Sequence, residues 1–123
     1  MNDIIAVMPC YKSSEIAPKL AKDVIKFVDK LICVDDCCPE FTVKKIGQSI
    51  NSEKIDFIFH ESNKGIGGAM KSGFIYALKF QPKIIIKIDS DGQMISYLIP
   101  KLIEPLLKGS IIALWFKANM FFI

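Results

Sequence analysis

The chain has 123 residues, of which 51% are hydrophobic and 24% are charged, and its formal net charge is +3. This size and composition are typical of one globular domain, so we predict a single domain over residues 1–123. The mild charge does not indicate a nucleic-acid-binding protein. All basic residues are Lys, which excludes phosphate recognition by a bidentate guanidinium group. The apolar runs at both ends are too short for a signal peptide or a membrane span, so we expect a cytoplasmic protein.

Apolar strands and amphipathic helices alternate along the chain. The expected elements are, in chain order, a strand at 4–8, a helix at 13–28, a strand at 31–34, a helix at 41–50, a strand at 55–59, a helix from the glycine-rich segment 63–68 to about 79, a strand at 84–88 and a helix at 98–107. Such alternation predicts an α/β fold with a doubly wound, mostly parallel, Rossmann-like sheet.

A doubly wound sheet binds ligands at the carboxyl ends of its strands, so the residues after each strand are the candidate site residues. They include Tyr11 after the first strand and Asp35-Asp36 after the second. Neighbouring side chains of an extended segment point in opposite directions. We therefore expect one of Asp35 and Asp36 to face a ligand and the other to cap the next segment or bond to the backbone.

Two carboxylates follow the fourth strand, whose residues Ile84 to Ile88 are apolar except for one Lys. Asp89 and Asp91 are spaced i, i+2, which in an extended backbone places both on the same side. Hard oxygen ligands in this place suit Mg²⁺ or Mn²⁺ that carries a diphosphate. The alternative for the same residues is a solvated turn, with Gly92 in a left-handed conformation.

The glycine-rich segment allows a second, weaker hypothesis. Residues 65–72 nearly spell the phosphate-binding loop G-x-x-x-x-G-K-S, which would make the chain a P-loop-like nucleotide-binding protein. Met70, however, occupies the position of the second loop Gly, and the segment follows the third strand instead of the first. We favour the simpler interpretation, in which Gly67 and Gly68 allow close packing of the loop and the helix start.

The Cys and His residues give no catalytic signal. The four Cys residues lack the paired spacing of a zinc site, so we expect reduced, buried thiols. His60, the only His, ends the third strand with no matched partner, and we expect a surface or capping role for it.

Four ordered segments resemble glycosyltransferase family 2, which has the GT-A fold: AVMPCYKSSEIAPKL, CVDDCCPE, NKGIGGAMKSGFIYAL and IIIKIDSDGQM. The resemblance covers about residues 3–107 and is greatest for the dolichol- or polyprenyl-phosphate sugar transferases. It implies a nucleotide-diphosphate-sugar donor such as a UDP- or GDP-sugar, Mg²⁺ or Mn²⁺, and inverting transfer, with a lipid phosphate at the inner face of the membrane as a candidate acceptor. Roles in cell-wall or polysaccharide synthesis belong to the same family.

The resemblance also implies roles for individual residues. The donor-binding residues would be Pro9, Tyr11, Asp35, Asp36, Lys64, Lys71 and Asp89. Among them, Pro9 and Tyr11 would line the nucleoside pocket, and Asp36 would contact the base or ribose. Lys64 and Lys71 would lie near the diphosphate. Asp89 and Asp91 match the family's D-x-D motif and would bind the metal, Asp91 above all.

The tail at about 108–123 departs from the family pattern. The family's K-G-N-R-F motif reads K-A-N-M-F here, from Lys117 to Phe121. The chain therefore resembles the donor-binding portion of a transferase, truncated before the acceptor side and the catalytic carboxylate. Two functions stay open at this point, namely metal-assisted sugar transfer and nucleotide-sugar binding by an inactive remnant. We expect the apolar residues Trp115, Phe116, Phe121 and Phe122 to form a buried edge strand, which would favour self-association if it were left uncovered.

Overall fold

The computed structural model of the protein describes residues 3–92, 96–109, 113–116 and 119–122. Its centre is a parallel sheet of four strands in the spatial order β3-β2-β1-β4. The elements are, in chain order, β1 (Ile4–Cys10), α1 (Ala17–Val24), β2 (Lys30–Asp35), α2 (Thr42–Ser49), β3 (Ile55–Phe59), α3 (Gly65–Leu78), β4 (Ile84–Lys87), the 3₁₀ helix η1 (Ser96–Leu98), α4 (Ile99–Leu107), β5 (Ala113–Phe116) and β6 (Asn119–Phe122).

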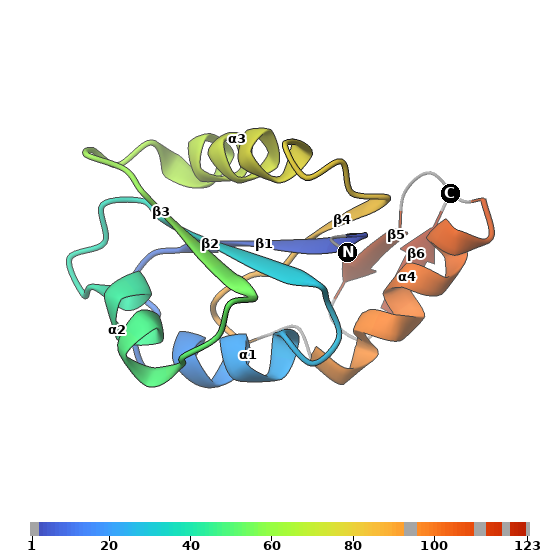
Figure 1. The fold of residues 1–123 in the computed structure, drawn as a ribbon, viewed down its shortest axis with the longest axis horizontal. Coiled ribbons are helices and arrows are strands. Elements are labelled where there is room, and N and C mark those ends of the chain that lie inside the picture. Colours follow the sequence, from blue (N-terminus) through green and yellow to red (C-terminus); the bar gives the residue numbers. More distant parts are fainter. Residues whose placement is uncertain (1–2, 93–95, 110–112, 117–118, 123) are drawn as a thin grey trace.

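Helices cover both faces of the sheet, with α3 on one side and α1 and α2 on the other (Figure 1). The alternation of side chains along β1 supplies both cores. Ala6 and Met8 pack in the larger core with α1, α2 and α4, whereas Ile5 and Val7 pack in the smaller core under α3. The doubly wound α/β fold expected from the sequence is therefore confirmed.

The structure shifts several predicted boundaries. β1 continues to Cys10 and β2 to Asp35, because these two central strands pair with neighbours through residues that are not uniformly apolar. The first helix begins only at Ala17, with Pro18 in its first turn, while Ser13 serves the loop before it. The last two strands form a separate antiparallel hairpin. Lys117, where the K-A-N-M-F segment begins, lies outside the described residues.

The glycine-rich segment is helical instead of forming a loop, because α3 begins at Gly65. Gly73 allows α3 to pack closely on the sheet, because it is buried where the helix crosses β1 and β2. A Cβ atom there would overlap the side chain of Val7 and lie 3.3 Å from Val34 Cγ2. Our expectation of close packing between the loop and the helix start is confirmed for Gly68, where a Cβ atom would lie 2.5 Å from Lys64 Cβ, and is wrong for Gly67, which has open space around it.

In the part of the chain that the structure describes, every helix is too short or too polar to span a bilayer.

We predict that Gly73→Ala destabilises the protein by about 1–3 kcal/mol, because the added methyl group forces α3 away from β1 and β2. Gly67→Ala is the matched control in the same helix. Its methyl group meets nothing within 4 Å, and the higher helix propensity of Ala should add up to about 1 kcal/mol of stability. Urea denaturation of the two variants measures both changes. Equal effects at the two positions would contradict the close approach at Gly73.

Candidate functional site

The carboxyl ends of the parallel strands lie at the end of the sheet opposite to the N-terminus (Figure 1). Residues at this end line a pocket of about 390 Å³. Strand order reverses there, because the chain moves outward from β1 to β2 and β3 and then returns to place β4 on the other side of β1. Open parallel sheets bind ligands at such a reversal. The walls come from the segments after β1 and β4, from the start of α3 and from Asp36.

The segment after β1 is held in place by its backbone and by Ser13. Lys12 has a left-handed φ of 53°, which is uncommon for a residue other than Gly. Its backbone N–H donates to Cys38 Sγ at 3.1 Å, and the N–H of Ser13 donates to Thr42 Oγ1 at 3.3 Å. Pro9 and Tyr11 line the pocket, and their role on the nucleoside side stays a prediction. These bonds tie the pocket wall to the start of α2.

Asp89 and Asp91 both line the pocket, but not by the geometry that we expected. β4 ends at Lys87, and the backbone turns at Ser90 and Asp91 instead of staying extended. The turn is fixed by Ser90, which is 7% exposed and shares a hydrogen bond of 2.5 Å with the hydroxyl of Ser13. Both carboxylates lie at the pocket, as predicted, but the extended backbone from which we predicted this is wrong.

Asp89 and Asp91 bring to the pocket the carboxylate oxygens that a hard divalent cation prefers. The described residues contain no group of three or more His, Cys, Asp and Glu side chains able to hold a metal. A cation here would therefore take two protein ligands at most, from Asp89 and Asp91, and the rest from phosphate oxygens and water. This is the usual coordination of Mg²⁺ bound together with a diphosphate.

Asp35 and Asp36 diverge, as expected, and the structure assigns their roles. Asp35 Oδ1 accepts a hydrogen bond of 2.7 Å from the backbone N–H of Cys38, so it caps the turn after β2. It lies outside the main pocket, in a neighbouring cavity. Asp36 is 4% exposed and lines the main pocket. Its Oδ1 accepts a hydrogen bond of 2.7 Å from the backbone N–H of Lys64.

His60 has two partners, so our expectation of an unmatched histidine is wrong. Its Nδ1 lies 2.8 Å from Asp36 Oδ1, and its Nε2 lies 2.8 Å from Ser72 Oγ. Both side chains of the His60–Asp36 pair are 5% exposed. The sequence did contain a signal for this contact. Asp36 and His60 each follow a strand directly, and β2 and β3 pair with Asp35 opposite Phe59.

The network changes the acidity of Asp36. Burial by itself raises the pKa of this carboxyl group. The hydrogen bonds from His60 and from the backbone N–H groups of Lys64 and Gly65 outweigh burial and lower the pKa below its usual value. Asp36 is therefore a fixed, buried negative charge at the pocket, and it links β2 to β3 and α3.

The lysines at the pocket are not the two that we named. The side chains of Lys64 and Lys71 are exposed and do not line the pocket, and Lys64 contributes only its backbone N–H. Lys12 and Lys87 line it instead, and Lys87 Nζ lies 3.0 Å from Asp89 Oδ1. Both could have been found, because Lys12 follows β1 and Lys87 ends β4. A role of Lys64 and Lys71 near a diphosphate stays a prediction.

The cysteines are free thiols. Cys10, Cys33 and Cys38 are buried, as expected, but Cys37 is exposed, because a left-handed φ of 58° turns it out of the loop. Burial raises the pKa of the Cys38 thiol, but hydrogen bonds from Thr42 and from nearby backbone N–H groups lower it overall. Cys38 thus takes part in the hydrogen bonds of the loop. Cys10 stays a neutral thiol, because a hydrogen bond with Cys33 and burial raise its pKa.

The structure does not support the P-loop hypothesis. The segment that resembles a phosphate loop is the first turns of α3 itself, so its backbone N–H groups mostly bond within the helix. Met70, at the position of the second loop Gly, is 8% exposed and packs in the core. α3 also follows β3, which lies at the edge of the sheet and not beside the strand reversal.

Comparison with known proteins identifies relatives over most of the chain. Residues 5–120 match the family described as Glycosyl transferase family 2. An uncharacterized protein of Methanocaldococcus jannaschii is 30% identical over 106 residues, which are 86% of this chain and 42% of that protein. The UDP-N-acetylglucosamine–dolichyl-phosphate N-acetylglucosaminyltransferase of Methanococcus voltae is 29% identical over 87% of this chain and 48% of its own length.

Two further matches agree with the family. The undecaprenyl-phosphate mannosyltransferase of Micrococcus luteus is 26% identical over 82% of this chain and 43% of its own length. The chain thus spans less than half the length of these curated relatives. The crystal structure of S. aureus TarS 1–349 superposes with a TM-score of 0.59 at 21% identity, covering 84% of this chain and 32% of that one. This likeness shows the fold.

We predict that Asp36→Asn lowers the free energy of unfolding at pH 7 by about 1–2 kcal/mol, because hydrogen bonds to a charged acceptor are stronger. The folded-state pKa of Asp36 lies below its unfolded value. Its contribution is therefore present above about pH 4 and is lost as the pH falls through the folded-state pKa. Urea titrations from pH 7 to pH 2 should show the gap to the wild type closing only in acid. A gap that stayed constant would contradict the lowered pKa.

Proposed function

The chain belongs to glycosyl transferase family 2, and from this membership and its pocket we propose that it binds the nucleotide-diphosphate-sugar donor of a sugar transferase acting on a polyprenyl phosphate. One observation carries the proposal. Asp36, Asp89, Asp91, Lys12 and Lys87 come from three different strand ends and line one pocket at the strand reversal. Carboxylates for a cation and ammonium groups for phosphate are what a nucleotide diphosphate needs.

Each wall of the pocket has a part in this proposal. Tyr11 and Pro9 give the nucleoside an apolar surface beside β1. Asp36, held by His60, accepts hydrogen bonds from the base or the ribose. Lys12 is exposed at the mouth and has the reach to pair with a phosphate. The donor therefore lies across the end of β1, from β2 toward β4.

The divalent cation that we propose at Asp89 and Asp91 would neutralise charge on the departing nucleotide diphosphate. The acceptor in the proposal follows the two relatives named for dolichyl phosphate and undecaprenyl phosphate. A lipid phosphate has a second pKa of about 6 and is largely a dianion at neutral pH. Such a nucleophile requires no general base, only positioning and charge neutralisation.

Donor binding without transfer is the second candidate function. Glu104 is a carboxylate beyond the donor pocket, and it lies on the exposed side of α4 with Lys108 Nζ 2.8 Å from its Oε1. It does not line the pocket. The chain's own residues thus supply the donor side of the reaction, and a measurement of transfer separates the two functions.

We predict that UDP or GDP binds to the chain with Mg²⁺ or Mn²⁺ and binds at least about tenfold more weakly in chelator, since like charges on carboxylates and diphosphate repel. Asp89→Asn and Asp91→Asn should each weaken the metal-dependent binding by a similar factor. Isothermal titration calorimetry with and without EDTA measures these affinities.

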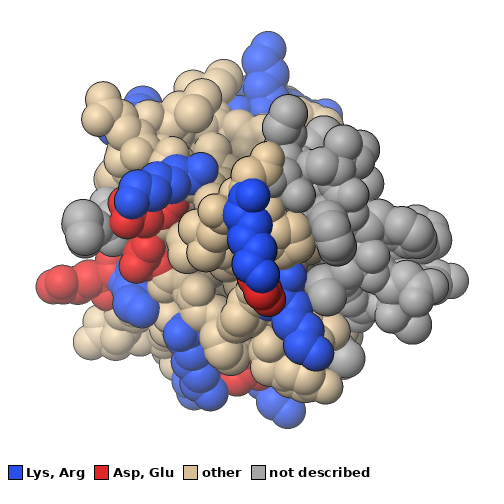
Figure 2. Space-filling view, turned by 90° about the vertical axis from the view of Figure 1, so that its right-hand side faces the viewer, with Lys and Arg blue, Asp and Glu red and all other residues tan. Residues whose placement is uncertain are grey.

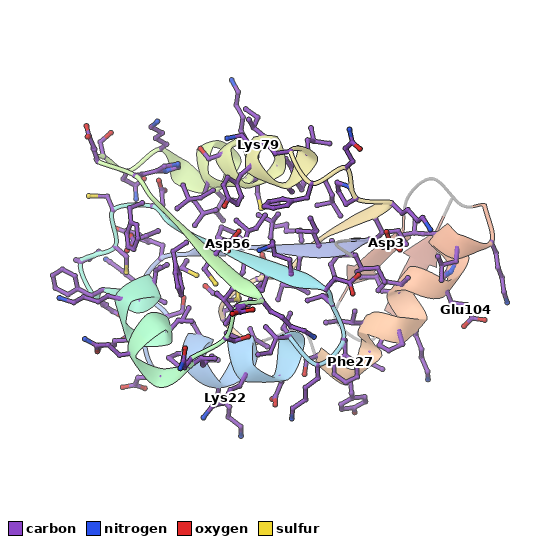
Figure 3. The ribbon with its side chains drawn as sticks, in the orientation of Figure 1. Asp3, Lys22, Phe27, Asp56, Lys79 and Glu104 are labelled. Carbon is purple, nitrogen blue, oxygen red and sulfur yellow. The ribbon has the colours of Figure 1, made fainter. Side chains whose placement is uncertain are left out.

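Asp3→Asn is the matched control for Asp89→Asn. Asp3 pairs with Lys83 at the start of β4, as Asp89 pairs with Lys87 at its end. Figure 3 shows Asp3 at the end of the sheet away from the pocket, and Figure 2 shows that end, where basic and acidic side chains are interspersed. Equal nucleotide affinity in chelator, or an equal loss in the Asp3 variant, would exclude the metal-bridged donor site.

The transfer prediction uses the chain alone and the chain joined to the remaining part of its Methanococcus voltae relative. We expect the chimera to move radiolabelled sugar to a short polyprenyl phosphate, and the chain alone to do so weakly or not at all. Asp91→Asn in the chimera should reduce the rate by about a hundredfold, as expected when charge stabilisation of the leaving group is lost. A chimera that binds donor but transfers no sugar to polyprenyl phosphate would require a different acceptor class.

A further inference from the structure

Helix α3 is apolar on the side facing away from the sheet as well as on the side facing it. Ala69, Met70, Gly73 and Ala77 are buried against the sheet. On the outer side, the exposed fractions are 39% for Phe74, 54% for Ile75 and 61% for Leu78. Figure 1 shows that this outer side points away from α1, α2 and the sheet. A surface helix normally carries polar residues there.

The same outer side is basic. Lys64, Lys71 and Lys79 are exposed on α3 or at its start, at spacings that place them beside Phe74, Ile75 and Leu78 on a helix of 3.6 residues per turn. Residues 64–79, which are α3 with the residue on each side of it, contain three Lys residues and no Asp or Glu. This face, called here the α3 outer face, therefore combines apolar side chains with a net positive charge.

We propose that the α3 outer face binds the surface of an anionic lipid bilayer. Phe74, Ile75 and Leu78 would enter the boundary between headgroups and acyl chains, where interfacial helices bury their apolar side. Lys71 and Lys79 have stems long enough to keep their ammonium groups among the anionic headgroups. Lys79 already extends along an aromatic ring, with its Nζ 5.4 Å from the centre of Tyr76.

Charge and size favour a bilayer over a second copy of the chain. A symmetric dimer through this face would place lysines of one copy against lysines of the other, which is unfavourable. Three apolar side chains also fall well short of the roughly 800 Å² per partner that a stable protein interface buries. A bilayer meets both features, because it is negatively charged and accepts small apolar insertions.

The α3 outer face lies close to the pocket, so a bilayer bound to it would also be close to the pocket. Ile66, in the first turn of α3, is 65% exposed and lines the donor pocket. A bilayer against α3 would therefore lie beside the mouth of the pocket. The inference goes beyond the proposed function, and its test needs neither nucleotide nor sugar transfer.

The experiment compares two double variants of equal net charge. L78D/K79E changes the α3 outer face, and L107D/K22E changes exposed residues on α4 and α1. Leu78 and Leu107 are 61% and 68% exposed, so neither change disturbs the core. Figure 3 shows Lys79 and Lys22 on opposite sides of the sheet. Each double variant lowers the formal charge by the same amount. A difference in binding between them therefore reports on the location of the changes and not on net charge.

Co-sedimentation uses vesicles of phosphatidylglycerol and phosphatidylcholine in equal parts, and vesicles of phosphatidylcholine alone. We expect the wild type and L107D/K22E to bind the anionic vesicles within about twofold of each other, and L78D/K79E to bind at least about tenfold more weakly. Binding should also weaken in high salt, because the Lys contacts are screened.

Three results would overturn the proposal. The wild type could fail to bind anionic vesicles, or both double variants could lose binding equally, which would indicate net charge and no particular face. Sedimentation without lipid could also show a dimer that only L78D/K79E dissociates, which would assign the α3 outer face to self-association.

Discussion

β1 positions the other strands of the sheet and the pocket, because it pairs in parallel with β2 on one side and with β4 on the other. The pairing of β1 with β2 extends further along β1 than its pairing with β4 does. β2 pairs as far as Cys10, whereas the pairing with β4 stops at Val7. β1 therefore extends three residues beyond its pairing with β4. The segment after β4 turns beside these three residues. The pocket lies in the space that this difference in strand length leaves, at the point where strand order reverses.

The Asp36 network explains how a charged group stays in a buried wall of the pocket. A buried carboxylate without partners would be protonated or would destabilise the fold. Here the cost is offset by a short bond to His60 and by backbone N–H groups at the start of α3. The same bonds hold the end of β2 against β3 and α3. A ligand that meets Asp36 thus finds a carboxylate whose orientation is already fixed, which reduces the entropy lost on binding.

Sequence patterns predicted the sheet well and the site only in part. Apolar runs and the residues at strand ends were sufficient to place Asp36, Asp89 and Asp91 at one edge, because parallel strands all end there. They did not predict that His60 bonds to Asp36, which depends on the register of β2 and β3 and on Ser72 arriving from α3. Nor did these patterns show that Lys87 lines the pocket whereas Lys64 and Lys71 do not. A Lys at a strand end and a Lys after a glycine-rich run look alike until the helix start is known. The low helix propensity of Gly argued for a loop at 63–68, where α3 already begins at Gly65.

The pair of Lys87 and Asp89 links the electrostatics of the pocket to its ligand. Its Nζ–Oδ1 distance is 3.0 Å, but the side chains are 42% and 54% exposed, so the pair contributes less than about 1 kcal/mol. A divalent cation would compete with Lys87 for the Asp89 carboxylate, and so weak a contact gives way at little cost. The displaced ammonium group would remain beside the pocket, within reach of a phosphate. The lysine that pairs with Asp89 would thus be placed to pair with the diphosphate of the proposed donor.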